Sequence, residues 1–421
     1  MLKETLRRFV LPGTGGGSPL APGLYPFERE HDGRLARFQL RVDPDGAGLL
    51  MVDASRVLLL SPVGVFLAHA ILSGHSDAAV VKAGRRRFAG AGRLAEDLAA
   101  LRRAMDAMLD GRAGAVVADL SRRSGPLERR LSAPLCADLS LPTAAQGERI
   151  LRRLLEVGVP QVVVVVPPDP VGPDLFRLVE CAEDLGLVTG VRARATDLLR
   201  DDRLLDLAGA GLDHVDLYWL GEAAAHDAVY GEGDAERFTA AAQTAGDLDL
   251  FLVACLPLAA SAVGTVQRAL SELPERGVGA GAVFAVVGDE AEGALPPAAI
   301  PQVAAVVEAA ADAANLPVVW MPPCHLGSST PIAEAMRAGP RAGSRATIRV
   351  LPGGEVLPPT GPPAPAGNLL EDPWETIWGH EAFRPLREST EAPRCDTCPD
   401  LALCDLGCPK ERSGWAEGVT P

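Results

Sequence analysis

The sequence predicts an α/β protein with a partial or full parallel (β/α) barrel, preceded by a winged-helix-like α+β domain and followed by an irregular metal-binding domain. Three observations predict this order: short strand patterns followed by helices in residues 38–112, alternating strands and helices in 131–335, and a proline-rich segment with clustered cysteines in 340–421. The chain has 421 residues, of which 48% are hydrophobic, so it can form two or three cores.

Residues 1–37 are assigned to a lead segment. Its run of glycines at residues 12–17 resembles a phosphate-binding loop, but the Gly-Lys-Ser/Thr ending and a clear preceding strand are missing. We therefore predict a flexible segment that carries no chemistry.

The next segment, residues 38–112, has three strand patterns at 38–42, 48–53 and 56–60. Helical patterns follow, and one of them places four apolar residues at helical spacing: Leu94, Leu98, Leu101 and Met105. We expect a small α+β domain, either for binding a partner or for capping and dimerisation.

The barrel segment alternates buried strands with amphipathic helices. Short apolar runs rich in β-branched residues predict strands at 162–166, 215–217, 250–255, 283–287 and 318–321. A helix with Ile150, Leu151 and Leu154 on one face is expected to end at Gly158. Repeated βα units of this kind form a parallel barrel or part of one.

Ligand chemistry in such a barrel lies at the carboxyl ends of the strands. Asp169, Arg194 and Asp216 lie in or just after predicted strands and are our candidate catalytic residues. Further polar side chains occur at comparable positions: Arg192, His226, Asp289, Glu290 and His325.

The charge balance excludes some partners. A formal net charge of -15 argues against a nucleic-acid or anionic-membrane surface, because phosphate binding needs clustered Lys and Arg. The first ten residues have no apolar signal region, and no apolar stretch reaches membrane-spanning length. We expect a cytoplasmic protein.

Four of the eight cysteines are clustered near the end of the chain, with the spacing Cys395-x2-Cys398-x5-Cys404-x3-Cys408. This tight spacing favours metal ligation over disulfides. The other cysteines occur in apolar segments and are expected to be buried, as small hydrophobic residues often are: Cys136, Cys181, Cys255 and Cys324.

The barrel and tail together resemble radical SAM enzymes with a C-terminal SPASM domain. The resemblance rests on the segment 367–388, GNLLEDPWETIWGHEAFRPLRE, on the cysteine spacing that follows it, and on HDAVYGEGDAERF at 226–238. Residues 38–112 resemble the PqqD-like winged-helix domain, in which a precursor peptide pairs with the edge of a sheet.

The catalytic part of the resemblance is degenerate. The family's Cys-x3-Cys-x2-Cys motif is replaced by residues 133–150, which contain only Cys136. Pro167–Pro170 replaces Gly-Gly-Glu-Pro, and residues 193–195 replace Thr-Asn-Gly. Proline removes an N–H group and adds bulk where glycine allows close approach. We therefore expect no reductive cleavage of S-adenosylmethionine by this chain alone.

The SPASM-like part is also incomplete. The family's upstream Cys-x9-15-Gly-x4-Cys aligns with Arg341, Gly354 and Pro359, so both cysteines are replaced. The resemblance implies one 4Fe-4S cluster, held either by all four remaining cysteines or by Cys395, Cys398 and Cys404 with another ligand in place of Cys408. A tetrahedral zinc site and a metal-free site are the alternatives.

The resemblance therefore implies a binding or partner subunit in the maturation of a peptide or cofactor. Its partner would be a precursor peptide or a catalytically complete radical SAM homologue. Two alternatives stay open: an active enzyme with altered barrel chemistry, and a structural zinc protein.

Overall fold

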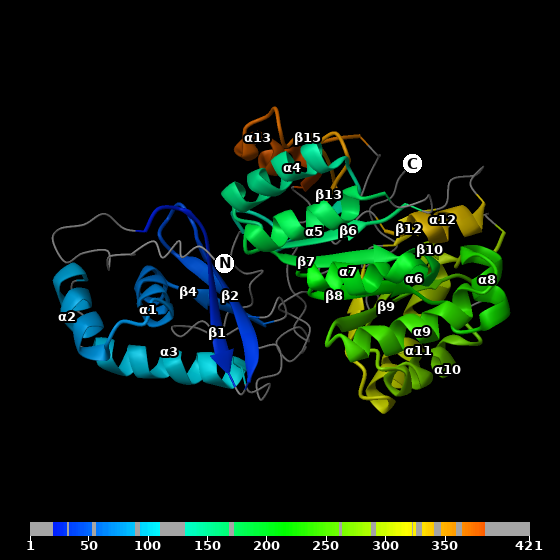
Figure 1. Cartoon of the computed structure of the whole chain (residues 1–421), viewed down its shortest axis with the longest axis horizontal. Helices are drawn as coiled ribbons and strands as arrows, with labels where there is room; N and C mark the ends of the chain where they lie inside the picture. The colour runs from blue at the N-terminus through cyan, green and yellow to red at the C-terminus, as the bar shows by residue number, and fades with distance from the viewer. Residues whose placement is uncertain are drawn as a thin grey trace. The chain divides into compact units, whose positions relative to one another are not determined.

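The structure is a computed structural model that describes residues 20–31, 33–52, 56–88, 93–109, 131–167, 172–260, 263–287, 292–321, 323–325, 331–340, 347–358 and 364–383. The chain divides into two compact units (Figure 1). The first contains residues 20–109, and the second contains nearly all described residues from Ala133 onward.

The N-terminal unit is built on an antiparallel sheet of four strands in the order β1-β2-β3-β4. These strands are β1 (Gly23–His31), β2 (Arg34–Val42), β3 (Gly48–Val52) and β4 (Arg56–Leu60). The structure confirms the three predicted strands and corrects the lead segment, which was expected to extend to residue 37. β1 and the first half of β2 lie in that segment and form a hairpin, because Gly33 at φ 78° makes the turn that brings them together.

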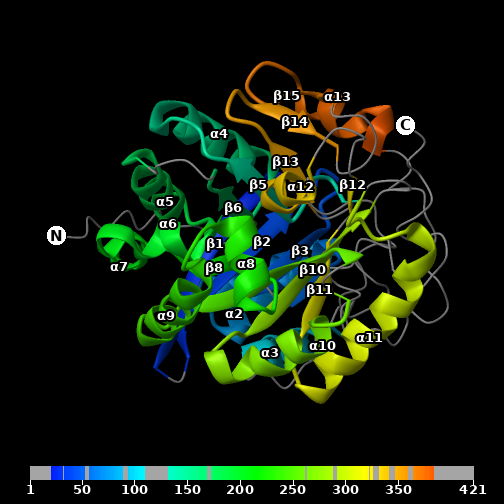
Figure 2. The ribbon, with the colours of Figure 1, turned by 90° about the vertical axis from the view of Figure 1, so that its right-hand side faces the viewer.

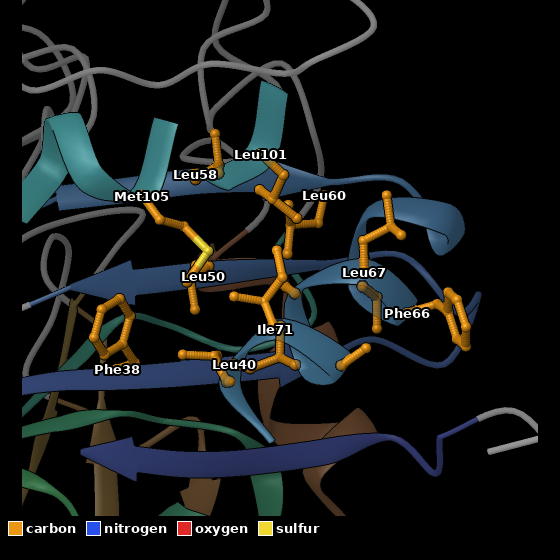
Figure 3. Packing of buried hydrophobic residues seen from close by; sticks show 14 of the residues in the cluster. Phe38, Leu40, Leu50, Leu58, Leu60, Phe66, Leu67, Ile71, Leu101 and Met105 are labelled. Carbon is orange, nitrogen blue, oxygen red and sulfur yellow. The ribbon is translucent and has the colours of Figure 1, made fainter. Parts of the chain in front are cut away.

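Three helices complete this unit: α1 (Pro62–Leu72), α2 (Asp77–Arg87) and α3 (Leu94–Leu109). α1 begins where the Ser61 hydroxyl accepts a hydrogen bond from the Gly64 amide at 3.2 Å, and Pro62 occupies its first turn. Figure 3 shows residues from the sheet, α1 and α3 in one core, with Phe38, Leu50, Ile71 and Met105 close together. The predicted apolar stripe of α3 is buried in this core.

The second unit contains one large, mainly parallel sheet. Its parallel strands follow one another in chain order: β5 (Cys136–Ser140), β6 (Gln161–Val165), β7 (Val188–Ala193), β8 (His214–Tyr218), β9 (Phe251–Leu258), β10 (Ala280–Val287) and β11 (Val318–Trp320). The described strand β5 pairs with a strand from the C-terminal region and not with β11. The structure is therefore the open, partial form of the predicted barrel.

Helices cover the outer face of this sheet, as Figure 2 shows. The longer ones are α4 (Ala144–Val157), α5 (Asp174–Asp184), α9 (Asp234–Asp247) and α11 (Ile300–Ala313). Shorter helices between them are α6 (Ala195–Leu199), α7 (Arg203–Gly209), α8 (Ala223–Tyr230) and α10 (Val266–Glu272). The longer helices bury apolar residues along one face, such as Ile150 and Leu154 of α4 and Leu175 and Leu178 of α5.

The region after residue 340 is more regular than the sequence predicted. It contains β13 (Thr347–Val350), β14 (Glu355–Leu357), β15 (Gly367–Asn368) and α13 (Trp374–Gly379). β13 pairs in parallel with β5, and β14 and β15 continue the sheet in antiparallel orientation. The prolines fall between these strands, so the sheet continues where an irregular segment was expected.

Candidate functional site

Three charged side chains meet on the inner face of the sheet. Arg192 on β7 donates to the Asp138 carboxylate on β5 at 2.6 Å and to the Asp216 carboxylate on β8 at 3.0 Å. A second bond to Asp216, from Nε of Arg192, measures 3.2 Å. Arg192 and Asp216 are direct neighbours across β7 and β8, whereas the Arg192 side chain crosses β6 to reach Asp138. We call these three residues the charge triad.

The triad is almost completely buried, with side-chain exposures of 3–6%. Burial alone would lower the pKa of Arg192, but the carboxylates of Asp138 and Asp216 raise it well above its usual value. The guanidinium therefore stays charged and forms fixed ion pairs. A buried charge that has both partners in place is stable, and losing one partner is costly.

His214 lies two residues before Asp216 on β8. Its Nε2 is 3.8 Å from a carboxylate oxygen of Asp216. Its ring lies over Gly190 on β7, where a Cβ atom would come within 2.0 Å of His214 Nε2. Glycine is thus required at position 190 because the imidazole occupies the space above the backbone. The ring extends the polar surface from the triad across β7 and β8.

Arg349 adds a second cation from β13, a strand that the sequence did not predict. It is in register with Asp138 on β5, and its Nε donates to the Ser140 hydroxyl at 3.0 Å. Burial lowers the pKa of Arg349, and the charge of Asp138 acts in the opposite direction. Ser140 is the last residue of β5, so Arg349 lies at the carboxyl end of that strand. Parallel barrels bind their ligands at the carboxyl ends of their strands.

Aromatic and thiol groups fill the same face further along β8 and β9. Tyr218 stacks on Tyr230 with ring centroids 5.1 Å apart. Burial raises the pKa of both phenols and raises the pKa of the Cys255 thiol to about 12. These groups stay neutral near pH 7, so Cys255 is not an activated nucleophile.

The structure places the predicted candidate catalytic residues in different environments. Asp216 lies in the triad, together with Arg192. Arg194 lies at the start of α6, where its Nη2 and Nε each donate to the Asp197 carboxylate at 2.7 Å and its Nη1 donates to the Tyr230 carbonyl at 3.3 Å. These bonds hold α6 against the end of α8 rather than project Arg194 at a ligand. Asp169 lies outside the described residues, as do Asp289, Glu290 and the side chain of His325.

The HDAVYGEGDAERF segment has a structural role in this chain. The His226 ring pairs with the Asp234 carboxylate at 2.9 Å, and both side chains are fully buried. Asp234 also accepts bonds from the amide and hydroxyl of Thr196, at 2.7 and 2.6 Å. The Asp227 carboxylate accepts bonds from the backbone amides of Gly233 and Ala235, which lie at the start of α9. These bonds join α6, α8 and α9.

The cysteine cluster Cys395, Cys398, Cys404 and Cys408 lies outside the described residues. Within the described ranges, no group of three or more His, Cys, Asp and Glu side chains is arranged to hold a metal ion. Of the scattered cysteines, Cys255 is buried as predicted, whereas the other three are only partly buried.

Cys136, the only cysteine in residues 133–150, is the first residue of β5. The loop that follows β5, from Leu141 to Thr143, contains no cysteine. Burial and the neighbouring charge of Asp138 raise the pKa of the Cys136 thiol, which disfavours the thiolate that binds iron.

Two features of the site were missed from the sequence. Asp138 belongs to the triad and Arg349 lies beside it, but their strands, β5 and β13, lack the apolar run that marks the others. The available signal was alternation: in CADLS and TIRV, every second residue is buried and apolar. Gly354, with φ 96°, lies in the turn between β13 and β14. Arg341 and Pro359 lie outside the described residues.

In the described part of the chain, no helix is both long enough and apolar enough to cross a membrane.

No model of a known protein family matches the chain. A stretch of 135 residues, 32% of the chain, is 36% identical to PqqA peptide cyclase from Bradyrhizobium diazoefficiens. The match spans 33% of that protein, so the chain matches about a third of the curated relative's length.

Solved structures show a likeness over nearly the whole chain. SuiB from Streptococcus suis bound to S-adenosylmethionine aligns with a TM-score of 0.54 at 14% identity, over 91% of this chain and 95% of SuiB. SuiB bound to the precursor peptide SuiA aligns with a TM-score of 0.53 at 13% identity, over 88% and 93%. At this identity the likeness shows the fold. The chain is thus similar in fold to SuiB and, over about a third of its length, similar in sequence to PqqA peptide cyclase.

Proposed function

We propose that this chain is a degenerate radical SAM/SPASM-like protein that serves as a binding or partner subunit in peptide maturation. The observation that carries the proposal is the position of Cys136 at the start of β5, together with a following loop that contains no cysteine. Three thiolates are needed to hold a cluster that leaves one iron open for S-adenosylmethionine. The residues at this position therefore do not fit that cluster.

The likeness to two peptide-linked proteins supports the class of partner. One relative is named for the PqqA peptide, and SuiB was solved with its precursor peptide SuiA. In this chain, the N-terminal unit has an antiparallel sheet whose outer strands are β1 and β4. We propose that a precursor peptide adds a strand to this sheet, so that backbone hydrogen bonds supply affinity and side-chain pockets supply selectivity.

The alternative of an enzyme with altered barrel chemistry has less support. Asp216 is bound by Arg192 at two nitrogens, and Arg194 is bound by Asp197, so neither group is available to a substrate. The charge triad and Arg349 are best explained as the polar core of the sheet. We propose that a catalytically complete radical SAM homologue supplies the chemistry of peptide maturation. A cytoplasmic location of this chain would give it access to such a partner.

Two measurements test this function. The anaerobically purified chain, reduced in the presence of S-adenosylmethionine, is expected to form no 5′-deoxyadenosine, while a radical SAM enzyme of known activity forms it in the same assay. Clear turnover by this chain alone would overturn the proposal. The tagged chain, captured from its source cells, is expected to bring down a small peptide or a second barrel protein. A lone monomer in that experiment would contradict the partner role.

A further inference from the structure

Part of the inner face of the large sheet, along β8, β9 and β10, is covered by a segment of the chain itself. This segment, residues 332–340, consists of α12 (Ile332–Ala338) followed by Gly339 and Pro340, and we call it the strap. Ala335 and Met336 of the strap are buried in one cluster with Tyr218, Cys255 and Phe284 from three neighbouring strands. Figure 2 shows α12 on the inner side of the sheet, near β13 and β12 (Cys324–His325).

The strap is fastened to α8 by two hydrogen bonds. The hydroxyl of Tyr230 donates to the Met336 carbonyl at 3.3 Å. From the solvent side, Nε of Arg337 donates to the Val229 carbonyl at 2.6 Å. One fastening is thus buried and the other exposed, and the exposed one can be removed without making a cavity in the core.

Further contacts fasten the strap to the sheet. The thiol of Cys324 on β12 lies 3.5 Å from the Ala335 carbonyl and 3.4 Å from the Gly339 carbonyl. The Pro340 carbonyl accepts a bond from Arg349 on β13 at 3.5 Å. These contacts reach both sides of the parallel sheet, since β12 pairs with β10 and β13 pairs with β5.

Gly339 allows the strap to approach the sheet closely. Its φ of 65° lies in the left-handed region, and a Cβ atom there would come within 3.2 Å of the Tyr218 hydroxyl. Tyr218 is the last residue of β8, so this contact lies at the carboxyl end of the strand. Parallel barrels bind their ligands at that end.

We propose that the strap is a built-in cover, and that a ligand reaches Tyr218 and Arg349 on the inner face only after the strap lifts. This inference deepens the proposed function and rests on it for its meaning. A chain whose barrel face is closed by its own helix can still bind a peptide or partner through its other surfaces. The covered face then explains why recognition and catalysis would be divided between two proteins.

The native thiol of Cys255 provides the test. It is fully buried beneath the strap, and its raised pKa makes it unreactive until it is exposed. The folded, full-length protein is treated with iodoacetamide near pH 8, and the labelling rate at Cys255 is followed by peptide mapping. Cys255 is expected to react slowly in the unaltered protein.

Arg337→Ala removes the exposed fastening. Losing one such hydrogen bond is expected to speed the labelling of Cys255 by about two- to tenfold. Met336→Ala removes a buried contact of the strap and is expected to speed it further. If Met336→Ala fails to fold, Arg337→Ala alone still decides the question.

Matched controls separate strap opening from general loosening. Arg268→Ala removes an exposed arginine of α10 that pairs with Glu272, and Met105→Ala makes the same truncation in the core of the N-terminal unit. Neither is expected to change labelling at Cys255. Rapid labelling in the unaltered protein, or equal rates in strap and control variants, would overturn the cover. Neither result bears on capture of a peptide or barrel partner, so the two proposals fail separately.

Discussion

Arg192 stabilises the buried charges on the inner face of the sheet, because its guanidinium pairs with two carboxylates at once. Asp138 and Asp216 come from strands on either side of β7, and both are nearly inaccessible to water. Desolvating a carboxylate is expensive unless a cation compensates it. Arg192 therefore decides whether β5, β7 and β8 can bring their polar side chains together.

Arg192→Met is expected to destabilise the second unit by about 3–5 kcal/mol, because two buried carboxylates lose their partner. Urea unfolding monitored by circular dichroism measures this loss. Arg268→Ala breaks an exposed pair with Glu272 and is expected to cost about 0.5 kcal/mol or less. Equal losses in the two variants would show that the triad contributes no more than a surface pair.

His69 makes the N-terminal unit sensitive to acid. Burial, with a smaller contribution from His75, lowers the pKa of His69 to about 4, and the ring packs edge-on against Tyr25 and Phe27. A depressed pKa means that the unfolded chain binds a proton more readily than the folded one. Stability from the neutral ring is thus fully present above about pH 6.5 and is lost as the pH falls towards 4.

The test compares urea midpoints between pH 7 and pH 4 in the unaltered protein and in His69→Gln. The unaltered protein is expected to lose stability over this window, and His69→Gln is expected to show a smaller loss with acid, even if it is less stable throughout. His75→Gln serves as the control and should keep most of the slope. An unchanged slope in His69→Gln would assign the acid sensitivity to other groups.

At the scale of elements, the sequence was most informative where strands are buried on both faces. β6 and β8–β11 were predicted to within a few residues, because each contains an apolar, β-branched run. β5 was missed because its inner positions carry polar groups, Asp138 among them. The pattern that identifies a buried strand is weakest where one face carries the site, so the triad could be predicted only in part.

β1 and β13 were missed for different reasons. β1 alternates partly buried and exposed residues and includes Pro26, which suits an edge strand but weakens the apolar pattern. β13 lies in a region rich in proline and glycine, and its pairing with β5 joins segments about 200 residues apart. Local patterns carry no information about such a partner.

The start of α1 allows a direct test of helix capping. Ser61→Ala removes the hydroxyl that accepts from the Gly64 amide and is expected to cost about 1 kcal/mol of stability. Ser76 occupies the same position before α2, but its side chain makes no capping hydrogen bond. Ser76→Ala is therefore the matched control and should change the urea midpoint little. A similar cost at both serines would mean that the hydroxyl of Ser61 does not stabilise α1 through this bond.

At the scale of the whole molecule, the predicted metal site consists of four cysteines near the end of the chain, outside the described residues. Four thiolates from Cys395, Cys398, Cys404 and Cys408 can close a single 4Fe-4S cluster, and such a closed cluster supports structure or electron transfer. We therefore expect anaerobically purified protein to be brown, with about four irons and four sulfides per chain.

Replacing all four cysteines with serine should remove both colour and iron, whereas Cys181→Ser, on the described helix α5, should keep them. One zinc ion and no colour would contradict the cluster in favour of a tetrahedral zinc site. Retention of iron by the fourfold variant would show that the metal is held elsewhere in the chain.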